Sequence, residues 1–189
     1  MKKAFFILFT FLMWNSAVIA QKIDRDYFND GYHHVLTKWQ EMPDDKDESY
    51  FFVKLQGTQE SNKTFFHLVF KPTRNESFSF FDGGKLLVKT TDGNVITLVS
   101  DHVTATEYDV VDYIFKVPMY RFYSIVSFPI SEEQLDKISE GILKLRFEMS
   151  GQNNLEYTYK KDKIGKHLKK AKQIIVNSLK NRKSFEDGF

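Results

Sequence analysis

The stretch Ile142-Leu-Lys-Leu-Arg-Phe-Glu-Met149 decides the expected fold class, because apolar and charged residues alternate along it. A period of two predicts a β-strand with one buried face and one solvated face. The side chains expected on the buried face are Leu143, Leu145, Phe147 and Met149. After the turn-forming residues 150–154, the alternation returns at Leu155, Tyr157 and Tyr159, so the two runs predict a hairpin.

Similar alternation on either side of turn residues predicts further strands. Residues 85–90 and 95–99 flank Asp92-Gly93, a pair that tolerates the positive φ angles of tight hairpin turns. Residues 50–55 and 64–71 predict a second hairpin, with the polar residues 56–63 as its loop. Other strands are predicted at residues 34–41, 77–81, 113–117 and 120–128, the last with Tyr120, Phe122, Val126 and Phe128 on one face. Pro118 and Pro129 are expected at strand ends or edges, because proline cannot donate to a ladder.

Two helices are predicted in the C-terminal third of the chain. Ser131 followed by Gln134 is typical of a capping box, which predicts a short helix near residues 131–140 that Gly141 stops. A long basic helix is predicted at about residues 162–183 by an apolar seam at helical spacing. The seam consists of Ile164, Leu168, Ala171, Ile175 and Leu179. A narrow aliphatic seam without aromatic residues favours docking on the protein's own sheet over attachment to an anionic membrane surface.

These elements predict a mainly β protein, an antiparallel β-sandwich or open barrel with a short helix near 131–140 and a long C-terminal helix. No linker divides the chain, so residues 21–189 are expected to form a single β-rich domain ending in the basic amphipathic helix. The chain contains 19 Phe and no Cys, so its stability is expected to come from an apolar core without disulfides.

The first twenty residues have the features of a signal peptide. Lys2 and Lys3 precede an apolar run at 4–14, and Ala20 is a small residue before the expected new N-terminus at Gln21. The run is shorter than the roughly 20 residues that a membrane span needs. We therefore expect export to the periplasm or the extracellular space, with no stable membrane insertion after signal cleavage. Export without cysteine favours a bacterial envelope over a eukaryotic secretory route, and a nucleic-acid partner is not expected.

Three segments of the chain carry a resemblance to other proteins. They are Gly84-Lys-Leu-Leu-Val-Lys-Thr-Thr-Asp-Gly-Asn-Val-Ile-Thr-Leu98, Phe128-Pro-Ile-Ser-Glu-Glu-Gln-Leu-Asp-Lys-Ile138 and Ile142-Leu-Lys-Leu-Arg-Phe147. In this order they resemble uncharacterised exported β-rich proteins of gut-type Gram-negative bacteria, over roughly residues 50–180. The resemblance implies a place in the bacterial envelope, and it implies no catalytic residue.

The sequence contains no motif for catalysis or for metal binding. His33 and His34 would point to opposite faces of a strand, and no other pair of histidines has the spacing of metal ligands. The acidic run 44–48 lacks the glycine of a calcium loop, since Tyr50 stands at the sixth position counted from Asp45. Nucleophile elbows and phosphate-binding glycine patterns are also absent from the sequence. No catalytic residue, metal site or cofactor is therefore predicted.

A group of tyrosines is the best candidate for a binding surface. Exposed tyrosine combines apolar area with a polar tip, so such a group can stack against sugar rings or bind peptide, although tyrosines at alternate strand positions can also belong to a core. The candidate residues are Tyr108, Tyr113, Tyr120, Arg121 and Tyr123. The leading hypothesis is an exported noncatalytic domain that binds a protein or a glycan in the bacterial envelope. The alternatives are a small exported hydrolase with carboxylates assembled by the fold, and a lipid-binding barrel.

Overall fold

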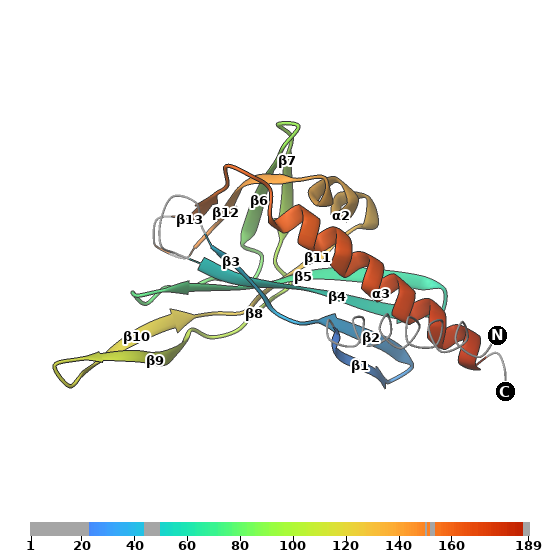
Figure 1. Ribbon diagram of the computed structural model, residues 1–189, viewed down its shortest axis with the longest axis horizontal. Coiled ribbons are helices and arrows are strands. Elements are labelled where there is room, and N and C mark those ends of the chain that lie inside the picture. The colour runs from blue at the N-terminus through green and yellow to red at the C-terminus, as the bar shows by residue number, and fades with distance from the viewer. Residues whose placement is uncertain (1–22, 44–49, 150, 152–153, 187–189) are drawn as a thin grey trace, which may run out of the picture.

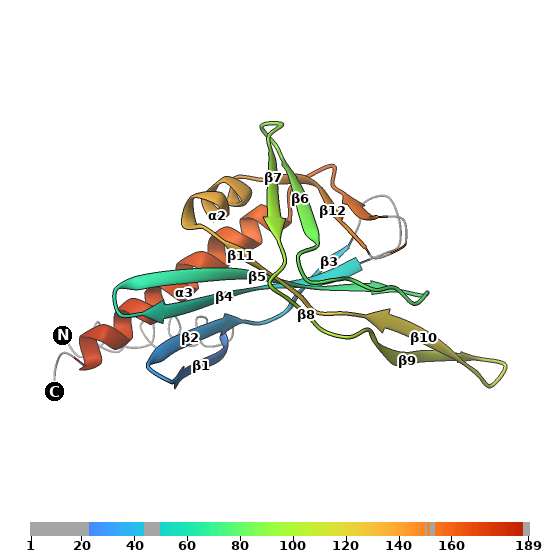
Figure 2. The same ribbon diagram turned by 180° about the vertical axis from the view of Figure 1, so that it is seen from behind.

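The computed structural model describes residues 23–43, 50–149, 151 and 154–186, so the predicted signal peptide and the acidic run 44–48 lie outside the described residues. A nine-stranded antiparallel sheet curls into a half-barrel (Figures 1 and 2). Its main path runs through β1 (Ile23–Asn29), β2 (Tyr32–Thr37), β4 (Tyr50–Glu60), β5 (Lys63–Arg74), β10 (Val117–Tyr123) and β9 (Glu107–Ile114). β3 (Gln40–Pro43) also pairs with β4, while β11 (Val126–Ile130) pairs with β5 and with β8 (His102–Val103).

A second antiparallel sheet has four strands in the order β13 (Leu155–Thr158), β12 (Ile142–Phe147), β6 (Lys85–Thr90) and β7 (Val95–Val99). Aromatic side chains join the two sheets. The rings of Phe70 and Phe147 lie 5.2 Å apart, and those of Phe51 and Tyr157 lie 4.6 Å apart. All four side chains are buried, so the core lies between the half-barrel and the second sheet. The expected mainly β fold is confirmed.

The long helix α3 (Ile164–Glu186) lies across β4 and β2 and also contacts the short helix α2 (Glu132–Ser139) (Figure 1). All five residues of its predicted seam are buried, so the helix docks on its own sheet as predicted. Lys172 joins the two helices, with Nζ 2.9 Å from Glu132 Oε1 and 2.6 Å from Asp136 Oδ1. The basic helix thus makes ion pairs with acidic residues of the body of the protein.

Local signals in the sequence predicted several elements correctly. The hairpin of β6 and β7 has the expected strand bounds, and Gly93 in its turn has a φ of 88°. α2 has the predicted capping box, because the Ser131 hydroxyl accepts from Gln134 N and the Gln134 side chain accepts from Ser131 N. β10 and β11 pair with β5 in one continuous register, so the strand predicted at 120–128 is correct apart from an interruption at residues 124–125.

Other expectations were wrong. Residues 56–63 are not a loop, because β4 and β5 continue through them to a tight turn at residues 61–62. Residues 77–81 form no strand, and the strand predicted at 34–41 is divided between β2 and β3. Pro118, by contrast, is the second residue of β10 and lies at an edge that no described strand covers, as expected. In β12, a register shift after Ile142 buries Ile142 and leaves Leu143 only half-buried, against the expected alternation.

Candidate functional site

The hairpin of β9 and β10 projects from the body of the molecule, and we call it the arm (Figures 1 and 2). The arm is attached to the sheet through β10, which pairs with β5 only at Phe122 and Tyr123 among the described residues. Beyond Arg74, the last residue of β5, the two strands continue without a neighbour on the β5 side. This overhang explains why every residue of β9 is exposed to solvent.

The turn at the tip of the arm is conformationally strained. Phe115 and Lys116 have φ angles of 48° and 69°, and positive φ at both central residues is the requirement of a type I′ hairpin turn. Asn or Gly usually occupies these positions, since a bulky side chain in this region is unfavourable. The Phe115 side chain is 96% exposed. The fold therefore holds a large aromatic side chain in an unfavourable conformation, in full contact with water.

One face of the arm is apolar. Side chains that alternate along β10 and their cross-strand partners on β9 share a face. Ring contacts verify this at the base, where the Tyr108 ring lies 5.2 Å from Tyr120 and 5.9 Å from Phe122. The apolar face consists of Tyr108, Val110, Tyr113, Pro118, Tyr120 and Phe122. Because Phe122 also packs against the core, this face continues the core-facing side of the sheet into solvent.

The opposite face of the arm is mixed and carries the acidic residues. Arg121 lies opposite Asp109 and Tyr123 lies opposite Glu107, while Asp112 lies nearer the tip opposite Met119. Val111 is the extra residue of a bulge, because the register shifts between Met119 and Tyr120. Thus β9 carries the three carboxylates Glu107, Asp109 and Asp112 and no basic residue.

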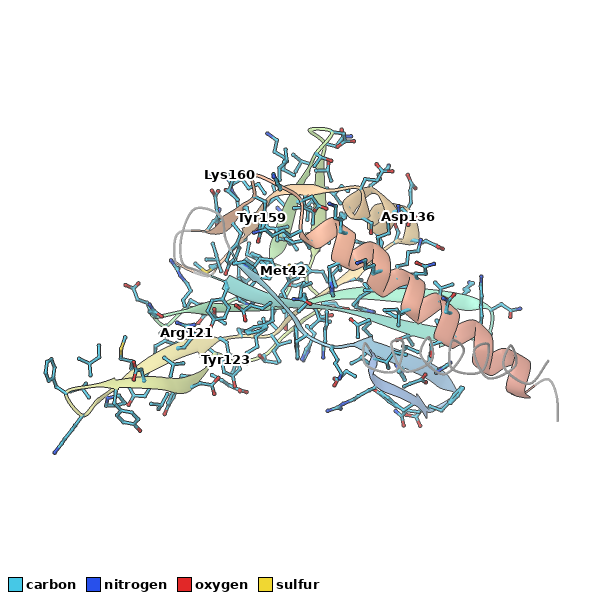
Figure 3. All side chains as sticks on the ribbon, in the orientation of Figure 1. Met42, Arg121, Tyr123, Asp136, Tyr159 and Lys160 are labelled. Carbon is cyan, nitrogen blue, oxygen red and sulfur yellow. The ribbon has the colours of Figure 1, made fainter. Side chains whose placement is uncertain are left out.

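All five residues predicted for a binding surface lie on the arm, but the structure divides them between its two faces. Tyr108, Tyr113 and Tyr120 belong to the exposed apolar face. Arg121 and Tyr123 belong to the other face and lie where the arm joins the sheet (Figure 3). The Arg121 guanidinium stacks over the Tyr50 ring at 4.7 Å and donates to the Tyr50 hydroxyl. The predicted set is therefore an exposed surface of three tyrosines and a supporting base of two residues.

Tyr123 is held by polar contacts on both sides. Its hydroxyl donates to Glu107 Oε2 at 2.7 Å, and the Lys71 ammonium lies 3.5 Å from the ring centroid. The hydrogen bond to Glu107, with a smaller effect of burial, raises the pKa of Tyr123 to about 12. Tyr123 therefore anchors the first residue of β9 to the sheet and is unlike the three solvent-exposed tyrosines in its role.

The strand β9 was not predicted from the sequence. A strand was expected at residues 113–117, but 115–116 form the turn and β9 ends at Ile114. The alternation Glu107-Tyr-Asp-Val was present as a signal, but the bulge at Val111 reverses it before Asp112. The exposed residues that were not singled out include Val110, Val111, Ile114 and Phe115.

Two arrangements bear on the hydrolase hypothesis. His33 Nε2 lies 2.7 Å from Asp26 Oδ1, and the Ser178 hydroxyl donates to Asp26 Oδ2 at 2.6 Å. A nucleophilic serine must form a hydrogen bond with the histidine, whereas here the aspartate lies between them, so these contacts fasten α3 to β1 and β2.

A cleft of about 600 Å³ between residues 37–43 and the start of α3 has Glu41 as its single carboxylate among the described lining residues. Neither arrangement supplies a catalytic pair of carboxylates.

The described part of the chain contains no group of three or more His, Cys, Asp or Glu residues arranged to hold a metal ion. Among the helices of this described part, none has the length and apolar character needed to cross a bilayer.

Comparison of the chain with protein-family models, with curated proteins and with solved structures found no match. The arm is therefore the feature from which a function is inferred.

Proposed function

We propose that this chain is an exported, noncatalytic domain of a bacterial envelope that binds another protein through the arm. The proposal rests on one observation: no described strand pairs with the outer edge of β9. This edge lies between the apolar face of the arm and the face that carries the acidic residues. Free strand edges pair readily with other chains, so they are normally short, covered or charged. Here an eight-residue edge strand stands clear of the body, and its aromatic side chains Tyr108 and Tyr113 are exposed to solvent.

The proposed mode of binding is the addition of a strand to β9. A partner segment in extended conformation would form main-chain hydrogen bonds with the free edge, while its alternate side chains cover the two faces of the arm. On one side they would meet the apolar surface of Tyr108, Tyr113 and Tyr120. On the other side they would meet Asp109 and Asp112. The complementary partner is therefore a strand in which apolar residues alternate with Lys or Arg.

A second copy of this chain is a poor partner for the same edge. Each β9 strand carries three carboxylates and no basic side chain, so two such strands side by side would bring six carboxylates together. If Val110 of one copy lay opposite Val111 of the other, Asp109 would face Asp112. Like charges directly opposite each other destabilise a strand pair. The acidic residues thus oppose self-association and favour a basic partner.

Synthetic peptides test the proposal directly. The octapeptides (Lys-Val)₄ and (Glu-Val)₄ have the same length and alternation and differ only in the sign of their charge. We expect the protein to bind the basic peptide roughly tenfold or more tightly, and the amide NMR signals of β9 to shift on binding. The double variant Asp109→Lys, Asp112→Lys should prefer the acidic peptide. Both aspartates are exposed, so this variant should stay folded, with a melting temperature lowered only slightly because Asp109→Lys places a second positive charge opposite Arg121.

The matched control is Asp136→Lys with Glu133→Lys, which makes the same charge change on α2, away from the arm. This control should leave the preference for the basic peptide unchanged. The proposal fails if reversing the charges on β9 leaves the preference as it was, or if the shifted amides lie outside the arm. Binding of neutral oligosaccharides to the tyrosine surface, with neither peptide bound, would favour a glycan ligand and would also overturn the proposal.

A further inference from the structure

The cleft between α3 and the connection from β2 to β3 arises from an interruption of the sheet. β2 pairs with β4 as far as Leu36 opposite Gln56, and β3 resumes at Gln40 opposite Val53. Between these two strands, the side-chain hydroxyl of Thr37 takes the place of main-chain hydrogen bonds to β4. It accepts from Leu55 N at 3.0 Å and donates to Leu55 O at 3.2 Å. Lys38 and Trp39 are thereby released from β4, and they form one wall of the cleft.

The other wall is a second stripe of α3, next to the seam that docks on the sheet. Residues three, four and seven positions apart share a helix face. Lys166 and Lys170 lie on this stripe, with Ala171 and Ile174 beside them, and Lys163 precedes it. The lysines are exposed at the rim, whereas Ala171 and Met42 are buried at the base (Met42 is labelled in Figure 3).

Positive charge predominates at this rim, because Glu41 is the single carboxylate among the described lining residues, beside Lys38, Lys163, Lys166 and Lys170. Lys38, Lys166 and Lys170 make no ion pair with the described residues, although Lys172 on the same helix makes two. Charges of one sign that converge on a concave surface attract ions of the opposite sign more strongly than scattered charges do. The cleft is therefore suited to an anionic group at its rim.

The base of the cleft is suited to an apolar group. Met42, Pro43, Ala171, Ile174 and the indole of Trp39 supply its lining. Neutral hydrogen-bonding groups are few, because the Thr37 hydroxyl is already engaged by Leu55 and the Gln40 amide donates to Glu41 O. A sugar with many hydroxyls would find few partners here. The volume of about 600 Å³ lies within the range of roughly 300–1,000 Å³ that is typical of small-molecule sites.

From this distribution we infer that the cleft binds an anionic amphiphile of the fatty-acid type, with its charged group at Lys38, Lys166 and Lys170 and its aliphatic chain on Trp39 and Met42. This site is separate from the arm and does not depend on the proposed function. One face of the Trp39 ring is occupied by the Lys54 ammonium at 4.4 Å, which fixes the indole at the edge of the cleft. Trp39 is the sole tryptophan of the chain from Gln21 onwards, so its fluorescence reports on this site alone.

The test is a fluorescence titration of the chain from Gln21 onwards, the form expected after removal of residues 1–20. Laurate, kept below its micelle concentration, should change the Trp39 emission in a saturable way. Butyrate has the same charged group without the long chain, and dodecyltrimethylammonium has the long chain with the opposite charge. Neither should produce a saturable change at the same concentrations. An equal response to butyrate or to dodecyltrimethylammonium would overturn the inference.

Charge variants locate the site. Lys166→Gln with Lys170→Gln should weaken laurate binding roughly tenfold, because two ion pairs at the rim are lost. Lys169→Gln with Lys180→Gln makes the same change on exposed residues of α3 that do not line the cleft, and it should change the affinity less than about twofold. Both pairs should melt like the unmodified chain. Equal weakening by the two pairs would show nonspecific attraction to the basic helix and would refute the site.

Discussion

Gly57 of β4 lies directly beneath Ile175 of α3, so closely that a Cβ atom at position 57 would be 2.3 Å from Ile175 Cγ2. Two non-bonded carbon atoms cannot lie this close, so one of them would have to shift. The absence of a side chain at position 57 therefore lets α3 approach the sheet closely. This close approach allows the seam residues on either side of Ile175 to be buried.

The first prediction concerns this contact. Gly57→Ala should lower the free energy of unfolding by about 1–3 kcal/mol, because the added methyl group overpacks the contact with Ile175. Ile175→Ala should cost about 2–5 kcal/mol through the cavity that it leaves. The double variant should lose at least about 1 kcal/mol less than the sum, since the alanine methyl at position 57 fills part of that cavity. Urea unfolding measures all three variants.

Gln56→Ala is the control for the first prediction, because Gln56 is the neighbouring residue on the opposite face of β4 and is only half-buried. It should change the stability by less than about 0.5 kcal/mol. Additive losses in the Gly57 and Ile175 double variant would contradict the close contact.

The second prediction separates the apolar seam of α3 from its charges. Leu168 is fully buried, so Leu168→Asp should destabilise the protein by more than about 3 kcal/mol by placing a carboxylate in an apolar contact. Replacing Lys166, Lys169 and Lys170 together by Gln should cost no more than about 1 kcal/mol, because all three are exposed. Thermal melts decide between the two effects, and an unchanged melt for Leu168→Asp would disprove docking of the seam.

The third prediction concerns the start of α3. Asp162 accepts from Gly165 N at 2.8 Å and Lys166 N at 3.1 Å, as an N-cap does, and also from Ile142 N at 3.1 Å. Asp162→Ala should therefore cost about 2 kcal/mol, more than an isolated cap, because the Ile142 amide in β12 also loses its partner. Hydrogen exchange should become faster at the Ile142 amide as well as at the first turn of α3. Exchange that changes only within α3 would show that the link to β12 is unimportant.

The fourth prediction is a pH dependence at the base of the arm. The hydrogen bond to Glu107 raises the pKa of Tyr123 from 10.0 to about 12. The contribution of this hydrogen bond to the free energy of unfolding is therefore present below pH 10 and is lost as the pH rises through 12. Tyr123→Phe should therefore be less stable than the unmodified protein below pH 10, and the difference should vanish above pH 12. A ¹³Cζ NMR titration reads the pKa directly, and Glu107→Gln should return it toward 10.0. A Tyr123 pKa that is unaffected by Glu107→Gln would refute the assigned cause.

The elements that the sequence predicted are those whose causes lie within a few residues. The capping box at Ser131 and the Asp92-Gly93 turn are local chemistry, and the seam of α3 follows from helical spacing alone. A further local signal was available but unused, because Asp30 and Gly31 have the positive φ angles of a tight turn and connect β1 to β2.

Several features that were mispredicted depend on contacts with other strands or layers of the fold. Thr37 divides β2 from β3 only because its hydroxyl meets the backbone of Leu55. The arm contains all five predicted tyrosine and arginine positions, and alternation along β10 alone separates Tyr120 from Arg121 and Tyr123. The placement of Tyr113 on the face of Tyr108 depends on the bulge at Val111, which no local pattern revealed. Whether a tyrosine at an alternating position is buried depends on whether another layer covers it, and for Tyr108 and Tyr120 no described layer does.

The hydrogen bond from Ser178 to Asp26 joins residues 152 positions apart, in the first strand and the last helix. A ribosome adding roughly 5–20 residues per second makes Ser178 roughly 8–30 s after Asp26. During that interval the β1–β2 hairpin can form, but the surface that α3 will cover remains without its helix. The nascent chain therefore depends on its last segment to complete the fold. Truncation before Ile164, which removes the whole seam of α3, should leave a protein that proteases degrade rapidly, even though every described strand of both sheets is present.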